Sequence, residues 1–168
     1  MEFFRLEEDK HFVNPIQLEI KEELLRQTEP FVWFTKIKDK EDLPDFFLIQ
    51  KWNQRYFCVS DSLKKLFDVY GNGYLRATPF FPTDAEKKRQ EAYWIIELPD
   101  KEFLVKRPQH STEELKLVSE PPYELHCFQG NDGQGDYILV SLFMTENILR
   151  KYYHGLLLVP VPLKEGEI

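Results

Sequence analysis

The sequence is poor in several residue types on which whole classes of protein depend. Its 168 residues include only two cysteines, two methionines and seven glycines. Two cysteines are too few for a disulfide framework. Cys58 and Cys127 both stand in apolar runs, so we expect two buried free thiols. Alanine occurs only three times beside 14 phenylalanines, eight tyrosines and three tryptophans, and this balance favours strands over helices.

The chain also lacks a long apolar run and a targeting signal. Residues 1–5 contain no basic segment followed by an apolar one, which a secretory signal requires. No apolar run is long enough to span a bilayer. We therefore expect no membrane association, and a reducing cytoplasmic location.

Basic residues are outnumbered by acidic ones, 22 to 29, which gives a net charge of −7. The excess lies at both ends: residues 1–50 and 101–168 carry net charges of −5 and −3, whereas residues 51–100 carry +1. Proteins that bind nucleic acid usually present a basic face, so we expect no nucleic-acid partner. The acidity is consistent with plain solubility, and also with an acidic surface for a basic partner protein.

Motifs for nucleotide and metal binding are missing. No Gly-x-x-x-x-Gly-Lys-Ser/Thr motif occurs, and the glycines of residues 130–135 lie between two expected strands, where they predict a tight turn. No Cys-x-x-Cys or His-x-x-x-His pair occurs. The histidines are scattered, at His11, His110, His126 and His154. We therefore expect no cofactor and no metal.

Nucleophilic catalysis would leave a local signature near a serine or cysteine. Ser60 follows an expected strand and opens an expected helix, but the glycines of a nucleophile elbow are missing around it. We interpret Ser60 as a helix cap. The acidic residues form many carboxylate pairs of the kind used in glycoside hydrolysis, and nothing singles one out. The sequence therefore predicts no catalytic residue.

Capping signals and periodicity predict an α+β fold. Helices are expected after residues that can cap them: residues 15–27 after Asn14, 61–70 after Ser60, a short polar helix from Thr83, and a helix from the cap Thr145 to His154. Strands are expected at residues 2–6, 31–37, 46–49, 56–59, 73–81, 92–98, 102–106, 115–118, 123–128, 137–144 and 156–161. We therefore expect one domain over residues 1–168, a mostly antiparallel sheet with two to four packed helices.

One pattern of strand, capping hydroxyl, helix, glycine and strand occurs twice. Aligning Ser60 with Thr145 places the copies 85 residues apart, in related units near residues 55–80 and 137–162. The similarity indicates either an internal duplication or two independent strand–helix junctions. In both cases the helices should bury one apolar face, which consists of Leu63, Phe67, Ile148, Leu149 and Tyr152.

The second unit ends in a pattern that resembles a known family. It consists of Met144-Thr145-Glu146, Ile148, Gly155 and Val159-Pro160-Val161, and Ser60, Leu63 and Gly71 match the earlier junction. This resembles the immunity proteins of bacterial polymorphic-toxin systems, in particular those with a closing "vSe-x-L…G…Pro-Val" signature. Thr145 stands where serine is more usual. The matching residues are mostly caps and core, so the resemblance implies a fold family and a toxin-binding role, and it locates no active site.

Charged and aromatic residues outside the expected core are candidates for binding a partner. The loop that follows residue 37 carries four acidic residues: Asp39, Glu41, Asp42 and Asp45. They can be simply solvated, or they can meet a basic toxin surface. Trp52 lies in the polar stretch 50–55, so we expect it to be partly exposed and able to anchor an interface.

Three hypotheses for function follow from the sequence. The first is an immunity protein, not an enzyme, that binds a cognate toxin by stoichiometric occlusion; the net charge is compatible with a basic toxin such as a nuclease and does not establish one. The second is a small enzyme with an unrecognised active site, and the third is a regulatory domain that binds another protein. A toxin gene beside that of the chain would favour the first.

Overall fold

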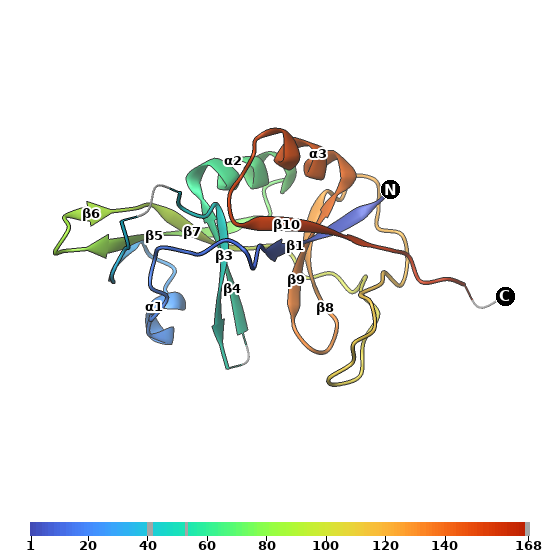
Figure 1. The fold of residues 1–168 in the computed structure, drawn as a ribbon. Helices are drawn as coiled ribbons and strands as arrows, with labels where there is room; N and C mark the ends of the chain where they lie inside the picture. Colours follow the sequence, from blue (N-terminus) through green and yellow to red (C-terminus); the bar gives the residue numbers. More distant parts are fainter. Residues whose placement is uncertain (40–41, 53, 167–168) are drawn as a thin grey trace.

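Two β-sheets and three helices make up the chain, whose computed structural model describes residues 1–39, 42–52 and 54–166. These residues form a single α+β domain that is mostly sheet, which confirms the predicted class. The strands divide between two sheets, and the longer helices lie together along one side of the molecule (Figure 1).

The four-stranded sheet contains the first and the last strand of the chain. Its strand order is β10-β1-β9-β8, and neighbouring strands are antiparallel. The strands are β1 (Phe3–Glu8), β8 (Cys127–Asn131), β9 (Asp136–Ser141) and β10 (Leu156–Val161).

The six-stranded sheet contains the middle of the chain. Its order is β2-β5-β7-β4-β3, with β6 paired to β5. Its pairs are antiparallel except β2 with β5, which is parallel. The strands are β2 (Phe31–Phe34), β3 (Phe46–Lys51), β4 (Gln54–Ser60), β5 (Arg76–Asp84), β6 (Arg89–Gln90) and β7 (Tyr93–Glu97).

Both sheets contain the same succession of a hairpin, a helix and a returning strand. The β3–β4 hairpin leads into α2 (Asp61–Tyr70), and β5 returns parallel to β4 with β7 between them. The β8–β9 hairpin likewise leads into α3 (Leu142–Arg150), and β10 returns parallel to β9 with β1 between them. The middle strand therefore comes from the next part of the chain in one unit and from the N-terminus in the other.

Corresponding residues of the two units lie 81 positions apart. Ser60 and Ser141 are the N-caps of α2 and α3, and each side-chain oxygen accepts a hydrogen bond from a backbone N–H three residues on, at 3.2 and 3.4 Å. Pro79 and Pro160 each pair with the middle strand of their sheet. The alignment of Ser60 with Thr145 is wrong by one helical turn, because Thr145 lies inside α3.

The two long helices cover a core that both sheets share. Leu63, Phe67 and Ile148 are at most 1% exposed, as their spacing predicts. Leu149 and Tyr152 are 62% and 86% exposed, so their predicted burial is wrong. Because α3 begins earlier than predicted, its buried face differs from the predicted one. The buried residues of α3 are Met144, Thr145 and Ile148.

The helix expected over residues 15–27 is reduced to α1 (Glu22–Leu25). Ile16 instead forms a β-bridge with Ile37, and the N–H of Gln17 donates to the carbonyl of Lys36 at 2.9 Å. Backbone groups that would bond within a helix therefore bond across to the chain that follows β2. Pairing with a distant segment outweighs the local capping signal.

The polar helix expected from Thr83 is also absent from the described residues. Thr83 and Asp84 end β5, and the chain turns directly into β6. The carboxylate of Asp84 accepts hydrogen bonds from the N–H groups of Ile37 (3.0 Å) and Lys87 (3.2 Å). These bonds hold the pKa of Asp84 below its usual value, against the effect of burial.

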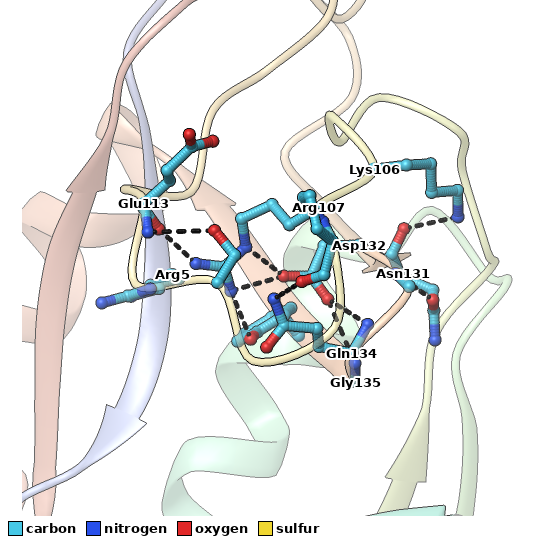
Figure 2. A network of polar contacts seen from close by, with 12 residues as sticks. Arg5, Lys106, Arg107, Glu113, Asn131, Asp132, Gln134 and Gly135 are labelled. Carbon is cyan, nitrogen blue, oxygen red and sulfur yellow. Dashed lines mark hydrogen bonds and ion pairs between the residues drawn. The ribbon is translucent and has the colours of Figure 1, made fainter.

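A long segment without regular strands, residues 98–126, packs against the four-stranded sheet. The strands expected at 102–106 and 115–118 are reduced to isolated bridges: Leu104 pairs with Leu117, and Leu117 also pairs with Leu163 after β10. An ion pair ties this segment to the turn between β8 and β9 (Figure 2): the guanidinium of Arg107 donates from Nε to Oδ2 of Asp132 at 2.6 Å. The same guanidinium donates to the carbonyl of Glu113.

Candidate protein-interaction surface

Trp52 stands in the turn of the β3–β4 hairpin, with 96% of its surface exposed. The polar residues around it in the sequence predict this exposure. The position 81 residues later is Gly133, which lies in the turn of the β8–β9 hairpin. Residues of both turns line one groove of about 280 Å³.

We call this region the hairpin-turn surface. It is lined by residues of both turns and their strands: Gln50, Trp52, Arg55, Asn131, Gly133, Gln134, Gly135 and Asp136. The lining is polar except for the indole of Trp52. A single large aromatic side chain therefore stands beside a polar groove that offers hydrogen-bonding groups.

Arg55 joins the two hairpins at the centre of this surface. Its Nε donates to Oε1 of Gln50 at 3.2 Å, and its Nη1 donates to the carbonyl of Asp136 at 3.1 Å. The guanidinium also lies over the ring of Tyr137, 5.1 Å from its centroid. A Cβ on Gly135 would come within 3.1 Å of Cζ of Arg55, so a glycine here gives the guanidinium its room.

The β8–β9 turn is held rigidly by its own side chains. Asn131 accepts from the N–H of Gly133 at 2.8 Å, and Asp132 accepts from the N–H groups of Gln134 (2.8 Å) and Gly135 (3.1 Å). Burial alone would raise the pKa of Asp132; the backbone donors and the Arg107 guanidinium outweigh it and hold the pKa below its usual value. The turn is therefore preorganised before any partner binds.

Two of the four predicted acidic residues have exposed carboxylates. Asp39 lies 3.2 Å from Nζ of Lys87, and Asp42 lies 3.8 Å from Nε2 of His154. The side chains of Asp39 and Asp42 are 84% and 65% exposed. Glu41, the third predicted residue, lies outside the described residues.

Asp45, the fourth, is engaged in the fold. Its Oδ1 accepts from the hydroxyl of Ser60 at 2.6 Å, and its Oδ2 accepts from the N–H of His154 at 2.8 Å. Its backbone N–H donates to the carbonyl of His154 at 2.8 Å. Asp45 thus joins the N-terminus of α2 to the loop before β10, and it offers a partner fewer free acceptor sites than Asp39 and Asp42 do.

The structure does not bring Trp52 together with the acidic loop. Asp45 precedes the first residue of β3 and Trp52 follows the last. A strand rises about 3.3 Å per residue, so the two positions lie roughly 20 Å apart. The predicted partner-binding residues therefore belong to two separate regions of the surface.

Sequence reasoning missed the contribution of Arg55 and of the β8–β9 turn. The side chain of Arg55 crosses to a strand 81 residues away, and no local pattern marks such a contact. The repeat was the available signal in the sequence. With the correct spacing of 81 residues, Trp52 aligns with Gly133 in a glycine-rich turn.

The thiols and serines that sequence reasoning considered are occupied by the fold. Cys58 and Cys127 are buried and free, as predicted, and burial raises the pKa of Cys127 to about 12. Ser60 caps α2, as predicted. The structure adds a contact between Nδ1 of His126 and the hydroxyl of Ser141 at 3.0 Å, but Ser141 has no exposed surface that a substrate could reach.

Residues 1–39, 42–52 and 54–166 contain no group of three or more His, Cys, Asp or Glu side chains placed to hold a metal ion. In the same part of the chain, no helix is long and apolar enough to cross a bilayer. The chain matches no protein-family model and no curated protein sequence.

Proposed function

We propose that the chain is a binding protein that neutralises a cognate toxin by covering part of its surface, and that Trp52 is the anchor of the interface. The observation that carries this proposal is the 96% exposure of Trp52 on a turn held next to a second turn. The role of a toxin inhibitor comes from the resemblance of residues 144–161 to immunity proteins.

An exposed tryptophan beside a rigid neighbouring turn suits this role for energetic reasons. Trp and Arg are enriched among the few interface residues that contribute most of the binding free energy. Trp52 and Arg55 stand together on the hairpin-turn surface. The hydrogen bonds of Arg55 and of the β8–β9 turn fix neighbouring groups before binding, so little conformational entropy is lost when a partner docks.

The net charge of −7 bears on how the partner arrives. An acidic chain attracts a basic protein over long range, and added salt screens this attraction. A basic nuclease toxin would therefore associate more slowly as salt is added. The exposed carboxylates of Asp39 and Asp42 contribute to this long-range field wherever the toxin finally docks.

A growth assay tests the proposal. Each toxin domain encoded beside the gene of the chain is expressed in bacteria together with the wild-type chain or one of its variants. We expect the wild type to restore growth and Trp52→Ala to lose this protection. The matched control is Phe34→Ala, which removes an aromatic ring 71% exposed on β2, far across the six-stranded sheet.

A second variant separates the two surface regions. Asp39→Asn combined with Asp42→Asn removes the exposed acidic charges and should leave most of the protection intact. If that variant fails to protect while Trp52→Ala protects fully, the interface lies at the acidic loop. If the wild type protects against none of the neighbouring toxins, the inhibitor function itself is wrong.

A further inference from the structure

A second and larger groove lies on the other side of Arg55. It has a volume of about 530 Å³ and runs between the end of α1, the open part of the six-stranded sheet and the β8–β9 hairpin. Ile95 and Thr78 contribute to its floor from neighbouring strands, where they form a cross-strand pair. Residues 16–25 pack on another part of the six-stranded sheet, and the groove begins where this covering segment stops.

Three arginines from three different elements line this groove: Arg26 after α1, Arg55 on β4 and Arg76 on β5. We call it the arginine groove. Such a concentration stands out because the whole chain carries only 22 basic residues against 29 acidic ones. Arg55 uses two of its five N–H donors in hydrogen bonds to protein acceptors among the described residues, so donors remain for a ligand.

The charge of the lining indicates the kind of ligand. Glu97 and Asp136 also line the groove, and Glu22 pairs with Arg26 at 2.9 Å; among the described residues, neither Arg55 nor Arg76 forms an ion pair with a carboxylate. The planar guanidinium matches the two oxygens of a carboxylate geometrically, and the apolar floor around Ile95 gives the adjacent aliphatic atoms a place to pack.

We propose that the arginine groove binds an acidic side chain on a segment of the partner protein. This inference rests on the proposed function, because Arg55 of β4 and Asp136 line both the groove and the hairpin-turn surface. A partner seated on Trp52 can reach the groove past Arg55. The partner then contributes a local carboxylate even where its overall charge is basic.

Peptide titration tests the groove without the partner. The probes are the acetylated, amidated peptide Glu-Glu-Leu-Glu-Glu, its Gln-Gln-Leu-Gln-Gln counterpart and inorganic phosphate, each added to ¹⁵N-labelled full-length chain. We expect the acidic peptide to shift the Nε–H resonances of Arg55 and Arg76 and to saturate in the millimolar range. The glutamine peptide should leave both resonances in place.

Variants make the result specific. Arg26→Gln combined with Arg76→Gln changes two exposed side chains, and it should weaken binding of the acidic peptide about tenfold, because charge-assisted hydrogen bonds are lost. The matched control is Lys151→Gln combined with Lys164→Gln, which removes the same charge from two exposed side chains that do not line the groove. An equal loss in both variants would show nonspecific attraction and overturn the proposal.

Phosphate supplies the competing outcome. Tighter binding of inorganic phosphate than of the acidic peptide at the same arginines would assign the groove to a small phosphorylated ligand and overturn the proposal. The growth assay separates the two levels of the account. If Arg26→Gln/Arg76→Gln protects as well as the wild type while Trp52→Ala does not, the proposed function stands and the groove proposal is wrong.

Discussion

At the scale of single residues, polar side chains join segments that lie far apart in the sequence. Asp45 bonds to Ser60 and His154, and Asp132 bonds to Arg107. The sequence indicates the exposure of Trp52 and the burial of both cysteines, because each follows from its immediate neighbours. It does not indicate the roles of these aspartates, because their partners lie 15 to 109 positions away.

The ion pair between Asp132 and Arg107 gives the first prediction. The Asp132 side chain has no exposed surface, so Asp132→Asn leaves the charge of Arg107 without its partner and should lower the free energy of unfolding by about 3 kcal/mol at pH 7. Urea unfolding measures the change. A loss below about 0.5 kcal/mol would mean that the pair contributes nothing to stability.

The same variant has a defined pH dependence. The pKa of Asp132 is lower in the folded chain than in the unfolded one, so its contribution to stability is present above the unfolded value of about 3.9 and is lost as pH falls through the folded value. The stability difference between wild type and Asp132→Asn should therefore shrink below pH 4. A difference that stays constant down to pH 2 would contradict the low pKa.

Thr145 gives the second prediction. Its hydroxyl is buried and has no hydrogen-bond partner among the described residues, and an unsatisfied buried hydroxyl is unfavourable. Thr145→Val keeps the shape and removes this group, so we expect the melting temperature to stay level or rise. Ser141→Ala removes the true cap of α3 and should cost about 1 kcal/mol. Calorimetry that gave the reverse order would restore Thr145 as the cap.

At the scale of elements, local signals succeed where they are unambiguous. The start of α2 follows from Ser60 alone. The start of α3 does not, because Ser141 and Thr145 are both hydroxyl residues one turn apart, and the apolar residues between them extend the preceding strand pattern equally well. The prediction of a helix over residues 15–27 is wrong because Ile16 pairs with Ile37. The periodicity of the local sequence cannot indicate such a long-range contact.

Two glycines that follow the helices give the third prediction. Gly73 and Gly155 have positive φ angles of 76° and 80°. A Cβ on Gly155 would lie 3.0 Å from Cβ of Pro44, whereas a Cβ on Gly73 would meet nothing within 4 Å. Gly73→Ala should therefore cost about 1 kcal/mol from backbone strain alone, and Gly155→Ala should cost clearly more. Equal losses in urea unfolding would show that the contact with Pro44 is unimportant.

At the scale of the whole molecule, two units of one arrangement share a pair of adjacent helices. The sequence predicts an α+β domain with a repeated element, and both features depend on local patterns. It does not predict that strands divide between two sheets or that β1 inserts between β9 and β10. These pairings join the first strand of the chain to its last two strands, and no local sequence pattern indicates them.

This arrangement gives the fourth prediction. Phe3 pairs with Val161, so the start of β1 and the end of β10 are adjacent, and a Gly–Ser linker can connect residue 168 to residue 1. A circular permutant that begins at His11 and ends at Lys10 places β1 after β10, as β7 follows β5 in the other unit. It should fold cooperatively with an unchanged circular dichroism spectrum. An unfolded permutant, beside a linear control with the same linker that folds, would contradict the equivalence of β1 and β7.

The central claim is that Trp52 anchors a protein interface. The most direct test is the affinity of the purified chain for the toxin domain against which it protects, measured by calorimetry for wild type and Trp52→Ala, with equal melting temperatures of the two chains as the check on folding. A hot-spot residue contributes 2 kcal/mol or more, so we predict a dissociation constant at least about 30 times higher for the variant. An unchanged dissociation constant would contradict the claim.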